Sequence, residues 1–75
     1  MKYDAELDAT GLLCPLPVLK IRKRLKSLAT KQIMKVIADD PATIIDVPHF
    51  CREQGHKLLK NQKDDKILTF FVQKK

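Results

Sequence analysis

The first part of the chain changes from a strand pattern to a helix pattern. Between residues 1 and 10, apolar and acidic positions alternate, which predicts a short strand with Tyr3, Ala5, Leu7 and Ala9 on one side. From Pro15 to Ala29, apolar residues recur three or four positions apart and basic residues fill the other positions, which predicts a helix. Its apolar stripe consists of Val18, Ile21, Leu25 and Leu28, with Leu19 beside it.

The rest of the chain predicts a strand, a second helix and a hairpin. Residues 32–38 are rich in β-formers and predict a strand, and Asp39 and Asp40 after it are able to cap a following helix. Residues 42–55 read as that helix, with Pro48 expected to interrupt or restart it and Gly55 expected to end it. Its candidate core residues are Ile45, Phe50 and Cys51. Residues 56–62 and 66–73 predict two strands, joined by a turn at 63–65.

The order β-α-β-α-β-β favours an α/β (α+β) two-layer sandwich, in which two helices pack on one face of a four-stranded mixed sheet. A right-handed crossover makes the strands on either side of the first helix parallel, and the hairpin makes the last two antiparallel. Residues 1–75 are expected to form one domain. A chain this short buries only about 60% of its unfolded surface, so any chemistry is expected near the surface. That favours a carrier, a binding module or a site completed by a partner.

Composition and charge exclude only a few classes of function. No apolar stretch approaches the length needed to cross a bilayer, and residues 1–10 lack the apolar core of a signal peptide, so we expect a cytoplasmic protein. The two cysteines, Cys14 and Cys51, are expected to be free thiols in a reducing compartment. The net charge of +6 suits an anionic partner such as RNA, a membrane surface or an acidic protein, but does not choose among them.

The chemistry is expected at Cys14, where the predicted strand ends and the first helix begins. The positive end of a helix dipole and its unpaired N–H groups stabilise a thiolate, so we expect a lowered pKa at Cys14 and attack on sulfane sulfur. Pro15 and Pro17 would shape the loop, and Gly11 would let it turn and let a partner approach. The alternative is that Cys14 packs as a small, inert apolar residue.

The other groupings of reactive residues do not predict a catalytic or metal site. No histidine or acid adjoins Cys14 in sequence, which argues against a Cys-His hydrolase. Cys51 could resolve a disulfide with Cys14, but packing beside Phe50 is the favoured interpretation. His49, Cys51 and His56 have poor ligand spacing and lack a fourth ligand, so we expect no metal site.

Two blocks of sequence carry a family resemblance. The first is residues 7–17, Leu-Asp-Ala-Thr-Gly-Leu-Leu-Cys-Pro-Leu-Pro, which contains a Cys-Pro-x-Pro motif at Cys14. The second comprises residues 38–43 (Ala-Asp-Asp-Pro-Ala-Thr), 46–48 (Asp-Val-Pro) and 50–56 (Phe-Cys-Arg-Glu-Gln-Gly-His). Together they resemble the TusA/SirA family of small sulfur-carrier proteins over nearly the whole chain.

The resemblance implies a sulfurtransferase with a β-α-β-α-β-β sandwich. Cys14 would accept sulfur as a persulfide from a cysteine desulfurase or similar donor and pass it to an acceptor protein. The destinations implied are 2-thiouridine in tRNA, molybdenum-cofactor synthesis or sulfur oxidation. We expect no cofactor, no stable nucleic-acid binding and no membrane association, in a monomer or weak oligomer.

The chain departs from the family pattern at three places. Leu16 stands between the two prolines where glutamate is frequent, and Leu13 precedes the cysteine where arginine is frequent. The turn before the second strand is Thr30-Lys31, without the usual glycine. These differences bear on the choice of partner and leave the motif cysteine intact.

A basic run follows the cysteine on the predicted helix and consists of Lys20, Arg22, Lys23, Arg24 and Lys26. It could dock an acidic partner or simply form the solvated face of the helix. A rival interpretation is a small RNA-binding module, but the chain lacks a Gly-x-x-Gly loop and an aromatic stacking pair on a central strand. Phe70 and Phe71 lie in the last predicted strand and point to opposite faces, so at most one is expected to be exposed. A third is a regulatory interaction domain in which Cys14 only packs.

Overall fold

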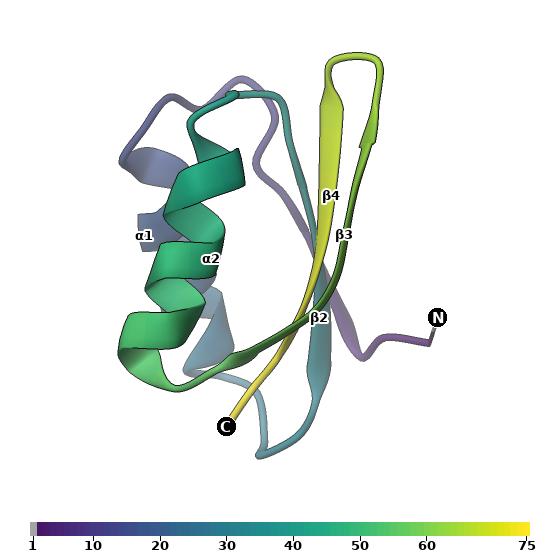
Figure 1. Ribbon diagram of the computed structural model, residues 1–75. Helices are drawn as coiled ribbons and strands as arrows, with labels where there is room; N and C mark the ends of the chain where they lie inside the picture. The colour runs from purple at the N-terminus through teal and green to yellow at the C-terminus, as the bar shows by residue number, and fades with distance from the viewer. Residues whose placement is uncertain (1) are drawn as a thin grey trace.

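The computed structural model describes residues 2–75, so of the predicted first strand only Met1 lies outside the described residues. The elements are β1 (Ala5–Asp8), α1 (Leu16–Leu25), β2 (Ile33–Ala38), α2 (Thr43–Gln54), β3 (Lys57–Asp64) and β4 (Ile67–Gln73). The sheet order is β1-β2-β4-β3, and both helices cover one face of it (Figure 1). The predicted two-layer fold is therefore confirmed.

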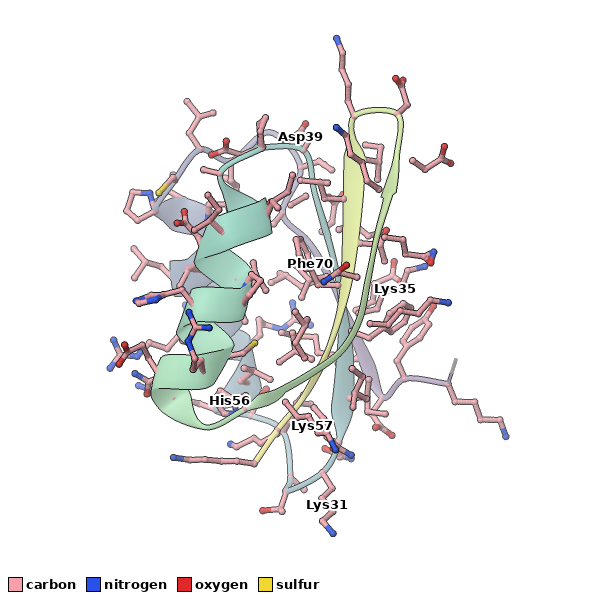
Figure 2. The ribbon with its side chains drawn as sticks, in the orientation of Figure 1. Lys31, Lys35, Asp39, His56, Lys57 and Phe70 are labelled. Carbon is pink, nitrogen blue, oxygen red and sulfur yellow. The ribbon has the colours of Figure 1, made fainter. Side chains whose placement is uncertain are left out.

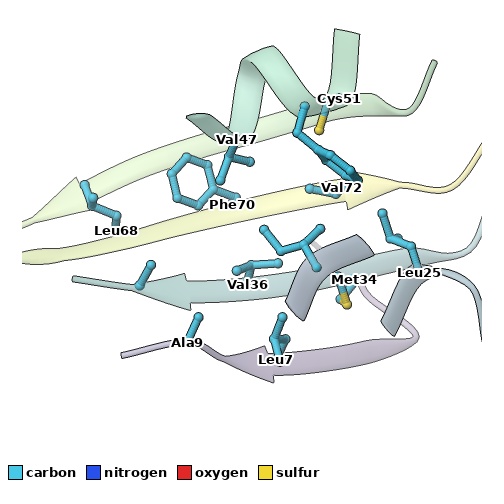
Figure 3. Close-up of a cluster of buried hydrophobic side chains, with 13 residues drawn as sticks. Leu7, Ala9, Leu25, Met34, Val36, Val47, Cys51, Leu68, Phe70 and Val72 are labelled. Atoms are coloured by element: carbon cyan, nitrogen blue, oxygen red, sulfur yellow. The ribbon is translucent and has the colours of Figure 1, made fainter. Parts of the chain in front are cut away.

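The strand register places one apolar set beneath the helices. β1 pairs parallel with β2, from Ala5 opposite Met34 to Asp8 opposite Ile37, and β4 pairs antiparallel with both β2 and β3. Because side chains alternate across a sheet, every second residue points to the helices. The resulting core holds Leu7, Ala9, Ile21, Leu25, Met34, Val36, Ala38, Val47, Phe50, Cys51, Leu68, Phe70 and Val72 (Figure 3).

The helices differ from their predicted form in three ways. α1 ends at Leu25 and not at Ala29, because Ser27 and Leu28 donate backbone N–H bonds three residues back and close the last turn. Pro48 lies inside a continuous α2, so the expected interruption is wrong. At position 48 the helix lacks the N–H group that would donate to the carbonyl of Ile44. The packing of the rest of the helix outweighs this lost hydrogen bond. Ile45 is 74% exposed and is not a core residue.

The core face of α2 follows helical spacing. Thr43, Val47, Phe50 and Cys51 are its buried residues, which confirms the prediction for Phe50 and Cys51. Gly55 ends the helix in the left-handed conformation, at φ +79°, as expected. No helix in residues 2–75 is long and apolar enough to span a membrane.

The hairpin turn lies further along the chain than predicted. Asp64 pairs with Ile67, so the loop is Asp65-Lys66 and not residues 63–65. Asp65 adopts a positive φ of 58°, which gives a two-residue turn the twist it needs without a glycine. The predicted boundaries of the turn are therefore wrong, but the predicted hairpin and the topology are unaffected.

β1, β2 and β3 run in the same direction, because β1 is parallel to β2 and both β2 and β3 are antiparallel to β4. α1 follows β1 and α2 follows β2, so both helices begin at the same end of the sheet and run in the same direction. The loop of residues 9–15 and the loop of residues 39–42 therefore meet there, and Figure 2 shows Asp39 at this end. This meeting point carries Cys14.

Candidate functional site

Cys14 is an exposed free thiol in the loop between β1 and α1. The peptide bond between Cys14 and Pro15 is cis, and α1 begins at Leu16. The alternative in which Cys14 packs as a buried, inert residue does not fit this exposure. The thiol is available to a partner.

Two adjacent aspartates fasten the cysteine loop to the start of α2. The backbone N–H of Gly11 donates to Oδ1 of Asp39 at 3.0 Å, and that of Cys14 donates to Oδ2 of Asp40 at 2.7 Å. The other oxygen of Asp40 accepts the N–H of Ala42 at 3.1 Å. Asp40 thus joins the cysteine to the first turn of α2 through one carboxylate, with charge-assisted bonds on both sides.

The cysteine opens onto a cavity between the two helices. Its volume is about 470 Å³, and it is lined by Cys14, Pro15, Val18, Asp46, His49, Phe50, Glu53 and Gln54. Val18 and Phe50 give it apolar walls, whereas Asp46, His49 and Glu53 come from one face of α2. His49 Nε2 lies 3.8 Å from Oε1 of Glu53. The cavity is open enough to admit part of another protein.

Two carboxylates raise the pKa of the Cys14 thiol above its ordinary value. The first cause is a side-chain hydrogen bond with Asp46, followed by desolvation and by the negative charges of Asp46 and Asp40. The expected lowering of this pKa is therefore wrong. The surroundings of Cys14 therefore favour its neutral thiol over the thiolate.

The first residues of α1 explain why the helix dipole does not lower the pKa of Cys14. Pro15 and Pro17 have no N–H, and the N–H of Leu16 donates to the carbonyl of Leu13 at 2.8 Å. The helix end therefore offers few free donors to the sulfur. The prolines that shape the loop also remove the groups that would stabilise a thiolate.

The residues predicted to support Cys14 occupy different places. Pro15 lines the cavity, and Pro17 is a buried residue in the first turn of α1. Gly11 has φ +80° with open space around it, a conformation that favours glycine. All three thus define the path of the loop.

The basic residues of α1 do not line the cysteine cavity. The four in α1 and Lys26 at its C-cap are all exposed, and Arg22 and Lys26 line a separate hollow that also includes Lys74 and Lys75. Arg24 donates to the backbone carbonyl of Glu6 at 3.2 Å. The acidic opening around Cys14 and the cationic face of α1 are therefore distinct surfaces.

The other candidate residues are not brought together. Cys51 is buried, and desolvation raises its pKa to about 11, which is unfavourable for thiol exchange with Cys14. His49 is exposed and His56 stacks on Phe50 with ring centroids 5.7 Å apart. Within residues 2–75, no three His, Cys, Asp or Glu side chains group as metal ligands.

The aromatic residues of β4 do not form a stacking surface. Phe70 and Phe71 point to opposite faces of the sheet, yet both are buried, at 2% and 7% exposure. Tyr3 covers Phe71, with ring centroids 6.0 Å apart, and Lys35 lies over the Tyr3 ring. On the open face of the sheet, where Figure 2 shows Lys35, this cover leaves Phe71 unavailable for stacking.

Asp46 is the site residue that sequence reasoning missed. It lies 32 positions after Cys14, and only the packing of α1 beside α2 brings the two together. Asp39 and Asp40 were expected to cap α2, but its N-cap is Ala42, without a side-chain cap hydrogen bond, and the bonds of the two aspartates to the cysteine loop were not foreseen. The signal available in the sequence was the resemblance of residues 38–43 and 46–48, which includes all three aspartates.

Comparison with known proteins agrees with this geometry. The model of a family described as "Sulfurtransferase TusA" matches residues 5–74. The sulfur carrier protein TusA of Pseudomonas putida strain GB-1 is 46% identical over 72 residues, covering 96% of this chain and 90% of that protein. Its counterpart in Pseudomonas syringae pv. tomato is 42% identical over 75 residues, covering 100% of this chain and 89% of that protein.

A solved structure supports the fold independently. The crystal structure of a SirA-like protein from Desulfitobacterium hafniense superposes with a TM-score of 0.82 at 21% identity, covering 93% of this chain and 96% of that chain. The two-layer architecture is thus preserved at low sequence identity.

Proposed function

Because this chain belongs to the TusA family of sulfur carriers, we propose that Cys14 is the residue on which the sulfur travels. The observation that carries the proposal is the exposed thiol of the Cys-Pro-x-Pro motif, held at the mouth of an open cavity. The second cysteine, Cys51, is buried, so its sulfur is not accessible to a partner in the way that Cys14 is.

The proposed reaction is two successive thiol exchanges on sulfane sulfur. The Cys14 thiolate attacks the outer sulfur of a donor cysteine persulfide; a new S–S bond forms at Cys14, the donor S–S bond breaks, and the donor leaves as a thiolate that takes up a proton. An acceptor thiol then attacks the outer sulfur on Cys14 and releases Cys14 as its thiol. Neither step consumes an oxidant or a reductant.

The site favours a relay that depends on partners. The cavity is open and encloses no substrate, and the nearby carboxylates disfavour the Cys14 thiolate, so a docked donor that offsets their charge would favour the reactive form. We propose a cysteine desulfurase or similar protein as the donor and a second protein as the acceptor. The exposed cations of α1 are proposed as the docking surface for an acidic partner, and thiolation of tRNA or molybdenum-cofactor synthesis as the destination.

The test is intact-protein mass after incubation with a cysteine desulfurase and cysteine. We expect the wild type and Cys51→Ser to gain one sulfur atom and Cys14→Ser to gain none. A sulfur gain that persists in Cys14→Ser, or depends on Cys51, would assign the carrier role elsewhere.

A further inference from the structure

The carboxylate of Asp46 lies at the reacting sulfur and at the wall of the open cavity. It comes from the first turn of α2, is half-buried, and lines the same cavity as Cys14, whose thiol pKa it raises. Within the described residues 2–75, no lysine or arginine forms an ion pair with it; the one ion pair on this face joins His49 to Glu53. Asp46 thus brings an uncompensated negative charge to the point where a donor must approach.

This local charge is opposite to that of the whole protein. The net charge is +6, and the five cations of α1 and its C-cap lie outside the cavity, whereas Asp46 and Glu53 line it. A cavity wall with one sign of charge attracts groups of the other sign over short distances. The charge that a docking group meets at Cys14 is therefore set by α2 and not by the overall charge.

We propose that Asp46 selects the sulfur donor, and that the cavity receives a partner loop on which a lysine or arginine adjoins the reactive cysteine. The cation pairs with Asp46 while the apolar walls at Val18 and Phe50 receive the rest of the loop. This proposal rests on Cys14 being the sulfur carrier. A cation paired with Asp46 also offsets the negative charge that raises the pKa of Cys14.

Two charged thiol reagents of similar size test this selection directly. Trimethylammonioethyl methanethiosulfonate is cationic and sulfonatoethyl methanethiosulfonate is anionic. In both reactions the Cys14 thiolate attacks the sulfur bearing the organic group and expels methanesulfinate, leaving a mixed disulfide. Because both rates scale with the same thiolate fraction, their ratio cancels any change in the pKa of Cys14 and reports the local charge.

We expect Asp46→Asn to lower the ratio of cationic to anionic rates roughly tenfold, since the two reagents differ by two charges. Asp64→Asn, the same change at the exposed end of β3, is the matched control and should leave the ratio unaltered. In the wild type, added salt should lower the ratio, which tests the proposal even if a variant folds poorly. An equal fall in both aspartate variants, or a wild-type ratio that rises with salt, would overturn it.

The second arm uses short peptides that carry a cysteine persulfide with either lysine or glutamate beside it. The lysine peptide should load Cys14 faster, and Asp46→Asn should remove the difference. Loading of both peptides at equal rates would overturn the selection by Asp46 while leaving the carrier role of Cys14 standing. Absence of any sulfur on Cys14 would instead contradict the proposed function.

Discussion

At the scale of single residues, the thiol of Cys14 experiences two opposing electrostatic influences. A helix end contributes about half a positive charge through its free N–H groups, whereas a contacting carboxylate contributes a full negative charge. The prolines of the motif have already removed two of those N–H groups, so Asp46 and Asp40 determine the direction of the pKa shift. The sequence could locate the cysteine and its motif, but not a carboxylate supplied by another helix.

Asp46→Asn should move the alkylation of Cys14 to lower pH. The carboxylate raises the thiol pKa, so removing its charge lowers that pKa and increases the thiolate fraction at neutral pH. Each unit of decrease raises the neutral-pH rate about tenfold, measured with uncharged iodoacetamide across a pH series. A profile that stays in place or moves to higher pH would show that Asp46 does not act on the thiol.

At the scale of elements, the helix order and the strand pattern were predictable from apolar spacing, whereas the core face of α2 was only partly so. Ile45 is the more apolar residue, yet Thr43 and Val47 are buried, because they share a helical face with Phe50 and Cys51. Pro48 was expected to break this helix from its local propensity, and packing of the face on either side outweighs that preference. Local propensity thus failed where tertiary contacts were stronger.

Asp40→Ala should loosen the connection between the cysteine loop and α2. The change removes the acceptor for the N–H groups of Cys14 and Ala42 and should cost about 1–3 kcal/mol of unfolding free energy, measured with urea. Hydrogen exchange at Cys14 should also become faster. Asp64→Ala is the control for loss of an aspartate, and an equal loss of stability there would contradict a specific role for Asp40.

Lys31→Gly should stabilise the protein. Lys31 adopts φ +70° in the turn before β2, a conformation that costs a non-glycine residue about 1–2 kcal/mol. Part of the gain is offset by the greater flexibility of glycine in the unfolded chain, so we expect a net increase of about 0.5–1 kcal/mol in urea unfolding. A decrease would mean that the Lys31 side chain contributes packing that exceeds the strain.

At the scale of the whole molecule, charge is divided between two surfaces. The opening at Cys14 carries Asp46 and Glu53, while α1 and its C-cap present five exposed cations and share one hollow with Lys74 and Lys75. In the sequence the basic run follows shortly after Cys14, but in the folded protein these side chains do not line the cavity at Cys14. A partner that contacts both surfaces would have to match charges of both signs, which favours a specific orientation.

Reversing one charge on α1 should slow loading by a donor protein without altering Cys14 itself. Lys20→Glu is expected to reduce the loading rate roughly two- to tenfold at low salt, with a smaller effect at high salt. Its rate of alkylation by iodoacetamide should match that of the wild type. Lys57→Glu, which makes the same change on β3, is the control, and an equal slowing there would mean that only net charge matters.

The central claim, that Cys14 both receives and releases sulfur, is tested most directly by following labelled sulfur through one cycle. The protein is loaded with radioactive sulfur from cysteine by a desulfurase, separated from the donor, and then mixed with an excess of acceptor thiol. The account predicts that wild type and Cys51→Ser acquire the label and lose it to the acceptor, whereas Cys14→Ser never acquires it. Label on Cys14→Ser, or label on the wild type that no thiol can remove, would contradict a carrier at Cys14.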